Sequence, residues 1–236
     1  MAEGAFPSTR QSVLARIQDQ DAGVRREALS AIVETYWKPA YKHIRLKWKA
    51  SADEAQDLTQ TFFASLLERE LLDRYDASRA AFRTYLRTCI DGLVANERKS
   101  NNRLKRGGGA QVLALDFQQA ESEVAVAPNS ESVEDVFYRE WQRQMFSLAI
   151  EDLRQYCAST GRQLRCQLFE RYDLAVESRP SYESLAGEFN IPATTVTNHL
   201  AWARRELRRC LLERLAAITP DESELRAEAA RLLAPE

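Results

Sequence analysis

The hydrophobic pattern of residues 181–209 has helical spacing on both sides of a short break. Apolar residues lie at positions 182, 185, 186 and 189, and again at 196, 200, 203 and 207, as they do in two amphipathic helices. Asn190 suits the left-handed conformation in which a chain leaves a helix. Pro192 suits a helix entry, where its missing N–H costs nothing. The segment is therefore predicted to fold as helix, turn, helix.

The polar face of the second of these helices carries short hydrogen-bonding side chains followed by arginines. They are Thr194, Thr195, Thr197, Asn198 and His199, then Arg204, Arg205, Arg208 and Arg209. Short polar groups suit base edges and arginines suit phosphates, so one interpretation is a helix that reads DNA. The other is an antiparallel helical hairpin with a solvated basic face.

Composition favours an all-α protein made of two small helical domains. The 236 residues include only 8 Gly and 7 Pro, and strand-like alternation is almost absent. The formal net charge of -2 argues against a chain that coats nucleic acid without specificity. The charge is segregated, however, because residues 83–106 hold 7 basic and 2 acidic residues while residues 116–140 hold 7 acidic and 1 basic. The chain therefore has separate basic and acidic blocks.

The sequence lacks the patterns of several function classes. Its 4 cysteines are widely spaced without a CxxC pair and it has only 2 histidines, so we expect no metal site and no disulfide framework. It has no glycine-rich phosphate loop with paired carboxylates and no Ser/His/Asp order, so we expect neither an enzyme nor a cofactor. No apolar run approaches the ~18 residues that cross a bilayer, which predicts a cytoplasmic protein without a membrane partner.

A helix predicted from Glu54 to about Arg69 has two apolar faces. Leu58, Phe62 and Leu66 form one stripe with the spacing of a core-facing side. The nearly opposite side combines amides with apolar groups: Gln56, Gln60, Phe63 and Leu67. The pattern indicates either a helix buried on both sides or a docking surface for a partner helix.

The next predicted helix, from Ala81 to about Ser100, combines a core stripe with a basic side. Phe82, Leu86, Ile90, Leu93 and Val94 are expected to face inward. The other side and its continuation carry Arg83, Arg87, Arg98, Lys99, Arg103, Lys105 and Arg106, interleaved with Tyr85, Asn96, Asn101 and Asn102. Basic residues among aromatics and amides are typical of surfaces that bind nucleic acid, including unpaired bases. A solvated charged face is the alternative.

Five segments are expected along the chain: an N-terminal arm (1–22), a first helical domain (23–106), a flexible acidic linker (107–132), a second helical domain (133–217) and an acidic C-terminal extension (218–236). Pro39 is expected to interrupt the first long helix, which begins near Val24. Gly107-Gly108-Gly109 opens the linker, in which no helical period is found. The extension could pack on the second domain and mask its basic helix, or bind a partner.

Two segments resemble bacterial sigma factors of RNA polymerase. Asp53 to Lys99 resembles sigma region two, and Ser181 to Arg209 resembles the second half of region four. Nothing between them is long enough for a region-three domain, so the chain is similar to the minimal extracytoplasmic-function class. The strings DLTQTFF (Asp57 to Phe63), ANERK (Ala95 to Lys99) and KRGGG (Lys105 to Gly109) resemble a subgroup often linked to serine/threonine protein kinases.

This resemblance implies three binding surfaces. The polymerase-binding residues would be Gln56, Asp57, Gln60, Thr61 and Phe63, against the clamp helices of the beta-prime subunit, with the beta flap as a further polymerase contact. The minus-ten residues would be Asp76, Ser78, Arg79, Phe82, Arg83, Tyr85, Arg87, Asn96, Arg98, Lys99 and Arg103, with the loop at Asp76 to Arg79 and Phe82 capturing a flipped base. The minus-thirty-five residues would be Thr194, Thr195, Thr197, Asn198, His199, Arg204 and Arg205.

The departures from the family pattern affect the expected strength of binding. Thr197, His199 and Trp202 stand where the family often has Lys or Arg, which predicts weaker electrostatic binding at minus-thirty-five. Gly92 replaces a common Asn in the minus-ten helix, and Asp91 adds a negative charge beside it. Thr61 stands where an acidic residue is common, so phosphorylation of Thr61 or Thr59 by a protein kinase could restore charge. An ordinary helical threonine is the alternative.

The resemblance therefore implies a sigma factor, not an enzyme, that binds core RNA polymerase, directs promoter recognition and helps melt the minus-ten region. The rival interpretation is a stand-alone helix-turn-helix transcriptional regulator that binds duplex DNA as a dimer on a palindrome. Such a regulator would not need the DLTQ segment, and the sequence offers no long dimerisation heptad.

Overall fold

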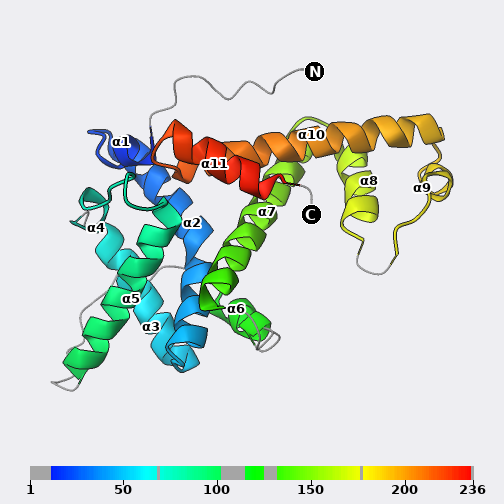
Figure 1. Cartoon of the computed structure of the whole chain (residues 1–236). Coiled ribbons are helices and arrows are strands. Elements are labelled where there is room, and N and C mark those ends of the chain that lie inside the picture. Colours follow the sequence, from blue (N-terminus) through cyan, green and yellow to red (C-terminus); the bar gives the residue numbers. More distant parts are fainter. Residues whose placement is uncertain (1–11, 68–69, 102–114, 125–131, 176–177, 235–236) are drawn as a thin grey trace. The chain divides into compact units, whose positions relative to one another are not determined.

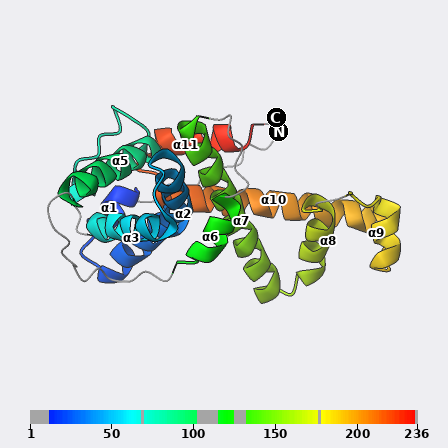
Figure 2. The same ribbon diagram turned by 90° about the horizontal axis from the view of Figure 1, so that it is seen from below.

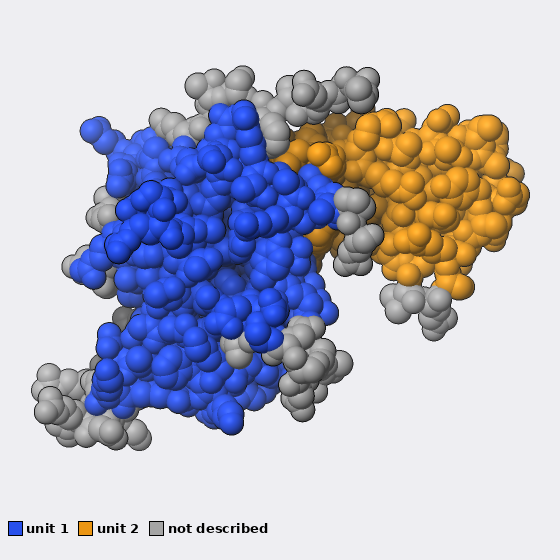
Figure 3. All heavy atoms as spheres, viewed as in Figure 1, with its two compact units in different colours: residues 1–144, 215–236 blue, residues 145–214 orange. Residues whose placement is uncertain are grey.

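The computed structural model describes residues 12–67, 70–101, 115–124, 132–175 and 178–234. Every regular element in these ranges is an α-helix (Figure 1), which confirms the all-α prediction. The chain forms two compact units, one of Met1–Gln144 with Leu215–Glu236 and one of Met145–Arg214 (Figure 3). None of the helices in the described ranges has the length and apolar character needed to span a bilayer.

The first unit is built around the long helix α2 (Ala22–Lys47), which packs against α3 (Ala52–Leu67) and α5 (Phe82–Asn101). Short helices α1 (Val13–Ile17) and α4 (Glu70–Asp73) add to this core. Asp21 begins α2, because its carboxylate accepts hydrogen bonds from the N–H groups of Gly23 and Val24. The described part of the predicted arm lies against the unit, since Val13 and Ile17 are buried.

Pro39 does not interrupt α2, so the predicted break there was wrong. Proline removes one backbone hydrogen bond and costs about 3 kcal/mol in a helix interior. Tyr36, Ala40, Tyr41 and Ile44, on either side of it, are all buried. Burial of this stripe on both sides of the proline offsets the missing bond and keeps the helix continuous.

The hydrophobic stripes of α3 and α5 form the core that their periodicity predicts. Leu58, Phe62 and Leu66 are buried on α3, and Phe82, Leu86, Ile90 and Val94 are buried on α5. Leu93 is only half-buried. Phe63 is also fully buried and meets Phe62 edge to face at 5.1 Å, so the core-facing side of α3 is wider than the predicted stripe.

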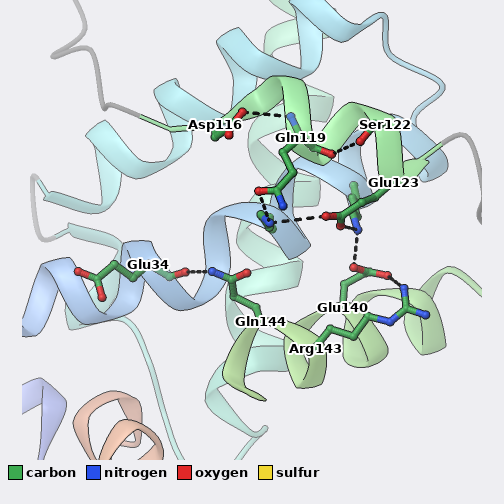
Figure 4. Close-up of polar contacts among 10 residues, drawn as sticks. Glu34, Asp116, Gln119, Ser122, Glu123, Glu140, Arg143 and Gln144 are labelled. Atoms are coloured by element: carbon green, nitrogen blue, oxygen red, sulfur yellow. Dashed lines mark hydrogen bonds and ion pairs between the residues drawn. The ribbon is translucent and has the colours of Figure 1, made fainter. Parts of the chain in front are cut away.

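Helix α6 (Phe117–Val124) lies within the segment predicted as a flexible linker and packs on α2 (Figure 2). Phe117 contacts the rings of Trp37 and Tyr41 at 5.5 and 5.2 Å. Polar contacts from α6 reach the same side of α2 (Figure 4). The described middle of the linker is thus folded, while Gly107 to Gly109 lie outside the described residues.

A buried lysine joins α6 and the start of α7 (Val133–Ser159) to α2. Lys42 donates to Glu123 at 2.6 Å and to Glu140 at 2.5 Å. Lys42 and Glu140 are both buried, so neither charge is left without its partner in the core. Residues 133–144 therefore belong to the first unit, whereas the sequence placed them in the second domain.

Helix α11 (Glu222–Leu232) also packs within the first unit. Its apolar residues Leu225, Ala229 and Leu232 are buried. Glu224 accepts from the backbone N–H of Phe82 at 2.6 Å and from the hydroxyl of Tyr75 at 2.9 Å. The acidic C-terminal extension thus covers the beginning of α5, which differs from the predicted packing on the second domain.

The second unit contains the end of α7, α8 (Gln163–Asp173), α9 (Tyr182–Glu188) and α10 (Ala193–Ile218) up to Arg214. Leu153, Leu168, Leu185, Val196 and Leu200 are buried in its core. Residues 181–209 fold as helix, turn, helix, as predicted.

Asn190 has a φ of 51° in the turn between α9 and α10, which confirms its left-handed conformation. The next N–H, of Ile191, donates to the carbonyl of Ala186 at 3.0 Å and closes the end of α9. Pro192 lies directly before α10, and its carbonyl accepts from Thr195 and Val196.

Candidate polymerase and nucleic-acid interfaces

The predicted polymerase-binding residues divide between the surface and the core. Asp57 is exposed, and Gln56, Gln60 and Thr61 are half-exposed on the same side of α3. Phe63 is buried, so its prediction as a surface contact was wrong. The two-faced pattern of α3 therefore reflects one wide buried side and one polar exposed side.

Thr59 is fully buried, and its hydroxyl donates to the carbonyl of Ala55 at 2.7 Å. A kinase cannot reach this hydroxyl in the folded unit, which removes Thr59 as a candidate phosphorylation site. The reason is its position next to the Leu58 and Phe62 stripe, on the side of α3 that packs into the core. Thr61 keeps a half-exposed side chain.

The first half of α5 is engaged by the rest of the unit. Phe82 is buried against the rings of Tyr36 and Tyr75 at 6.1 and 5.2 Å. Arg83 pairs with Glu228 of α11. Its guanidinium also lies over the rings of Tyr138 and Trp141, both on α7, at 4.8 and 5.7 Å. Phe82 is therefore a core residue, which contradicts its prediction as a DNA contact. Arg83 is half-buried and held by α7 and α11, and its role at the minus-ten element stays a prediction.

Two further minus-ten candidates on this half of α5 are similarly engaged. Arg87 pairs with Glu134 of α7 at 2.9 Å. The hydroxyl of Tyr85 donates to the carbonyl of Leu71, and its ring lies 5.2 Å from that of Tyr75. The sequence alone could not predict these contacts, because the partners on α7 and α11 are distant from α5 in the chain.

The second half of α5 presents the candidates that remain on the surface. Asn96, Arg98 and Lys99 are exposed. Arg98 donates to the carbonyl of Trp48 at 2.7 Å and pairs with Glu54 at 3.3 Å, which ties its side chain to the end of α2 and the start of α3. Arg103, the last minus-ten candidate, lies outside the described residues.

A cavity of about 430 Å³ opens beside this half of α5. It is lined from α3, α4 and α5 by residues that include Ser65, Leu71, Cys89, Gly92 and Asn96. A Cβ added at Gly92 would meet no atom within 4 Å, so there is room for a small side chain at this point of the cavity wall. The sequence pointed to Gly92 only as a departure from the family and did not predict the cavity.

The loop predicted to capture a base is exposed at Asp76, Ser78 and Arg79 and does not line the described part of this cavity. The carboxylate of Asp76 accepts from the backbone N–H and the hydroxyl of Ser78 at 2.9 and 2.7 Å. These hydrogen bonds lower the pKa of Asp76. They hold the loop in a local turn.

Asp91 faces α2, so its charge is not left beside the exposed basic groups. It accepts from His43 at 2.9 Å and from Trp48 at 2.8 Å, and pairs with Lys47 at 2.8 Å. Burial alone would raise the pKa of Asp91, but these three donors outweigh burial and hold the pKa below its usual range. The residue links α5 to α2.

In the second unit, the first turns of α10 present the polar face predicted from the sequence. Thr194, Thr197 and Asn198 are exposed, and Thr195 and His199 are half-exposed. Arg204 is held by Asp173 of α8 through two hydrogen bonds of 2.9 Å, which neutralises its charge. Arg205 is exposed.

A cluster of arginines and aromatics beside this face was not predicted. Trp202 of α10 stacks with Tyr156 of α7 at 6.3 Å and an interplanar angle of 17°. Arg165 of α8 and Arg162, which precedes α8, lie over the Trp202 ring at 4.7 and 5.3 Å. The periodicity of single helices could not reveal the cluster, because its members come from three helices.

One comparison with known proteins gives a match. Residues 35–104 match the family model for sigma-70 region 2. No curated protein and no solved structure matches the chain. The matched segment begins within α2 and includes α3, the cavity and α5. It supports a sigma factor of the sigma-70 family.

Proposed function

We propose that this chain is a promoter-specificity subunit of the extracytoplasmic-function class, which binds core RNA polymerase and directs it to bipartite promoters. The observation that carries the proposal is the match of residues 35–104 to sigma-70 region 2. The chain's resemblance to region four over residues 181–209, which fold as helix, turn, helix, supports the second half of the proposal.

The exposed side of α3 is the proposed polymerase contact. Gln56, Asp57, Gln60 and Thr61 form a polar surface on a helix whose opposite side is held in the core. A rigid helix with an exposed row of amide and carboxylate groups suits a partner helix with complementary donors. The beta-prime clamp helices are the partner that the resemblance implies.

The cavity beside α5 is the proposed site for one unpaired base of the minus-ten element. Its volume of about 430 Å³ is sufficient for a nucleobase, and it falls within the range of roughly 300–1,000 Å³ for small-molecule sites. Asn96 at its edge offers an amide that can donate to and accept from a base. Lys99 is exposed three positions further along α5, where it can contact a phosphate, and Arg98 contributes less because it is paired with Glu54.

We place the minus-thirty-five contact on the first turns of α10. Thr194, Thr197 and Asn198 are exposed there and carry no net charge, which suits direct contact with base edges. Because Arg204 is already paired with Asp173, it contributes less to phosphate binding than the sequence implied.

Phosphorylation of Thr61 is a further part of the proposal. The residue is half-exposed and lies on the same helix face as Asp57. A phosphate would add about -1.5 to -2 charges at neutral pH to a face that already has a carboxylate. This would strengthen contact with a basic partner surface and would place a serine/threonine protein kinase upstream of the subunit.

The experiment is reconstitution with core RNA polymerase. The full-length protein, its Thr61→Glu variant and core enzyme are mixed, and the reconstituted polymerase selects promoters from a library of genomic fragments. We expect a complex by gel filtration and defined transcript starts downstream of the selected sites. Asp57→Arg should abolish the complex, while Glu183→Arg, an exposed charge reversal on α9, should preserve it.

If neither the wild type nor Thr61→Glu bound core polymerase, the proposal would be contradicted. Tight binding of a palindromic duplex by the free protein, without polymerase, would indicate the stand-alone regulator instead. Equal core affinity for the wild type and Thr61→Glu would remove only the phosphorylation step.

A further inference from the structure

Arg162 and Arg165 have an unusual environment in the second unit. The guanidinium of Arg165 lies 4.7 Å from the centre of the Trp202 ring, and that of Arg162 lies 5.3 Å from it. Arg162 also donates to the hydroxyl of Tyr156 at 2.8 Å. Aromatic faces orient a guanidinium and restrict its rotamers, but they do not cancel its charge.

Five other arginines of this unit pair with carboxylates, whereas Arg205 and Arg208 are exposed on α10. Arg154 pairs with Glu170, Arg171 with Glu188, Arg204 with Asp173, Arg209 with Glu206 and Glu213, and Arg214 with Asp152. Within the described part of the chain, no carboxylate lies within salt-bridge distance of Arg162 or Arg165. Both are half-buried, so two positive charges lie beside one aromatic ring with no carboxylate partner among the described residues.

The two arginines lie next to the exposed polar face of α10. His199 and Trp202 are separated by three positions on α10 and so share one side of the helix. Burial lowers the pKa of His199, and the nearby charge of Arg165 lowers it further, which is consistent with Arg165 lying close to His199. The arginines therefore extend the α10 face onto α8.

We propose that Arg162 and Arg165, oriented by Trp202, form a phosphate-binding surface that contacts the DNA backbone beside the minus-thirty-five element. The inference rests on the proposed function, because it takes promoter DNA as the partner. It explains how α10 can have Thr197, His199 and Trp202 in place of basic residues. Arg165 of α8 and Arg162, which precedes α8, supply positive charge beside these positions, and Trp202 orients both.

A DNA backbone suits this surface for two reasons. The planar guanidinium can bind two phosphate oxygens at once, and stacking on Trp202 reduces the side-chain entropy lost on binding. Phosphates also lie on both sides of the groove that a recognition helix enters, so a second basic element beside that helix meets them directly.

The test measures promoter affinity of the reconstituted polymerase as a function of salt. The variants are Arg162→Gln, Arg165→Gln and the double variant, which keep most of the side-chain length and remove the charge. The matched control is the double variant Arg154→Gln and Arg171→Gln, whose arginines are paired with carboxylates in the same unit. Thermal unfolding confirms that each variant folds.

We expect the negative slope of log affinity against log salt concentration to become shallower by about 0.9 for each phosphate that the variant no longer neutralises. Affinity should fall several-fold for each substitution and by a similar factor on promoters with altered minus-thirty-five bases, because phosphate contacts do not read sequence. Arg165→Lys should recover part of the affinity. Trp202→Leu should weaken binding although it removes no charge.

A double variant with the same salt slope and affinity as the control would overturn the inference. A loss of core-polymerase binding with unchanged promoter affinity of the complex would also overturn it and assign the surface to polymerase. In both cases the wild-type complex still starts transcription at defined sites. If the wild type forms no complex with core polymerase, the proposed function itself fails, so the two failures are distinguishable.

Discussion

Asp91 gathers three donors from one end of α2: the imidazole of His43, the ammonium of Lys47 and the indole N–H of Trp48. Its side chain is 24% exposed, and that of His43 is fully buried. A carboxylate that is this well hydrogen-bonded is strongly favoured in its ionised form. The residue therefore acts as a structural link and adds little negative charge to the surface.

We predict that Asp91→Asn lowers the free energy of unfolding of the first unit by about 1–3 kcal/mol, because the ion pair with Lys47 is removed and the remaining donors meet a weaker acceptor. The folded-state pKa of Asp91 is lowered. The stability that its carboxylate contributes is therefore fully present above the unfolded-state pKa of about 4, and it is lost as the pH falls from there toward the lowered folded-state pKa. Denaturant unfolding of wild type and variant at several pH values measures this difference.

The control is Asp57→Asn, which removes an exposed carboxylate from α3 and should change the unfolding free energy by no more than about 0.5 kcal/mol. If the difference between Asp91→Asn and wild type were the same at pH 3 and pH 7, the carboxylate would not be the source of the stability.

Helices whose apolar residues keep helical spacing over several turns were predictable from the sequence. Helices that depend on contacts with distant parts of the chain were not. The stripes of α3 and α5 are buried as their spacing predicts, and Asn190 adopts the left-handed conformation that its residue type favours. Helix α6 was missed because its eight residues bury only Phe117 and Ala120, too few positions to define a period. Its stability comes from contact with α2.

The difference between local patterns and distant contacts also explains which candidate site residues could be predicted. The exposed side of α3 and the second half of α5 follow from local patterns, because each pattern already separates a core side from a polar side. The engagement of Arg83 by Glu228 and the stacking of Arg165 on Trp202 join residues of different helices. No periodicity within one helix contains that information.

Helix α5 has a glycine at a position where an alanine would fit. Gly92 lies inside the helix, and an added Cβ would meet nothing within 4 Å. We predict that Gly92→Ala raises the unfolding free energy by about 0.5–1 kcal/mol, because alanine loses less backbone entropy in a helix. The methyl group also narrows the cavity, so melting of the minus-ten region by the reconstituted polymerase should decrease.

Thermal unfolding and permanganate footprinting of the promoter measure these two effects. Gly187→Ala on α9 is the control, because its added Cβ also meets nothing within 4 Å and it is distant from the cavity in sequence. It should stabilise the protein without reducing melting. Unchanged melting by Gly92→Ala would argue against the cavity as the site of a flipped base.

At the scale of the whole molecule, the segregated charges of the sequence pair with one another. Lys42 lies between Glu123 and Glu140, Arg45 pairs with Glu121, and Arg83 pairs with Glu228. The acidic linker and the acidic extension thus neutralise basic residues of the first unit. Other basic side chains, among them Lys99 of α5 and Arg205 of α10, remain exposed on the surface.

Helix α11 is part of the first unit's fold because it buries Leu225, Ala229 and Leu232 and binds the first N–H of α5 through Glu224. We predict that truncation after Pro220 lowers the midpoint of thermal unfolding of the first unit. Each deleted leucine alone contributes about 1.5–3 kcal/mol through burial. The second unit's affinity for minus-thirty-five DNA should not change, because the described contacts of α11 lie within the first unit.

Calorimetry of the full chain and the truncated chain measures the first effect, and competition binding with minus-thirty-five duplexes measures the second. The control is the full chain with Glu222→Gln and Arg226→Gln, which removes an exposed ion pair on α11 and should leave both quantities close to wild type. A truncated chain that bound the duplex more tightly and unfolded at the wild-type temperature would show that α11 masks the second unit instead of completing the first.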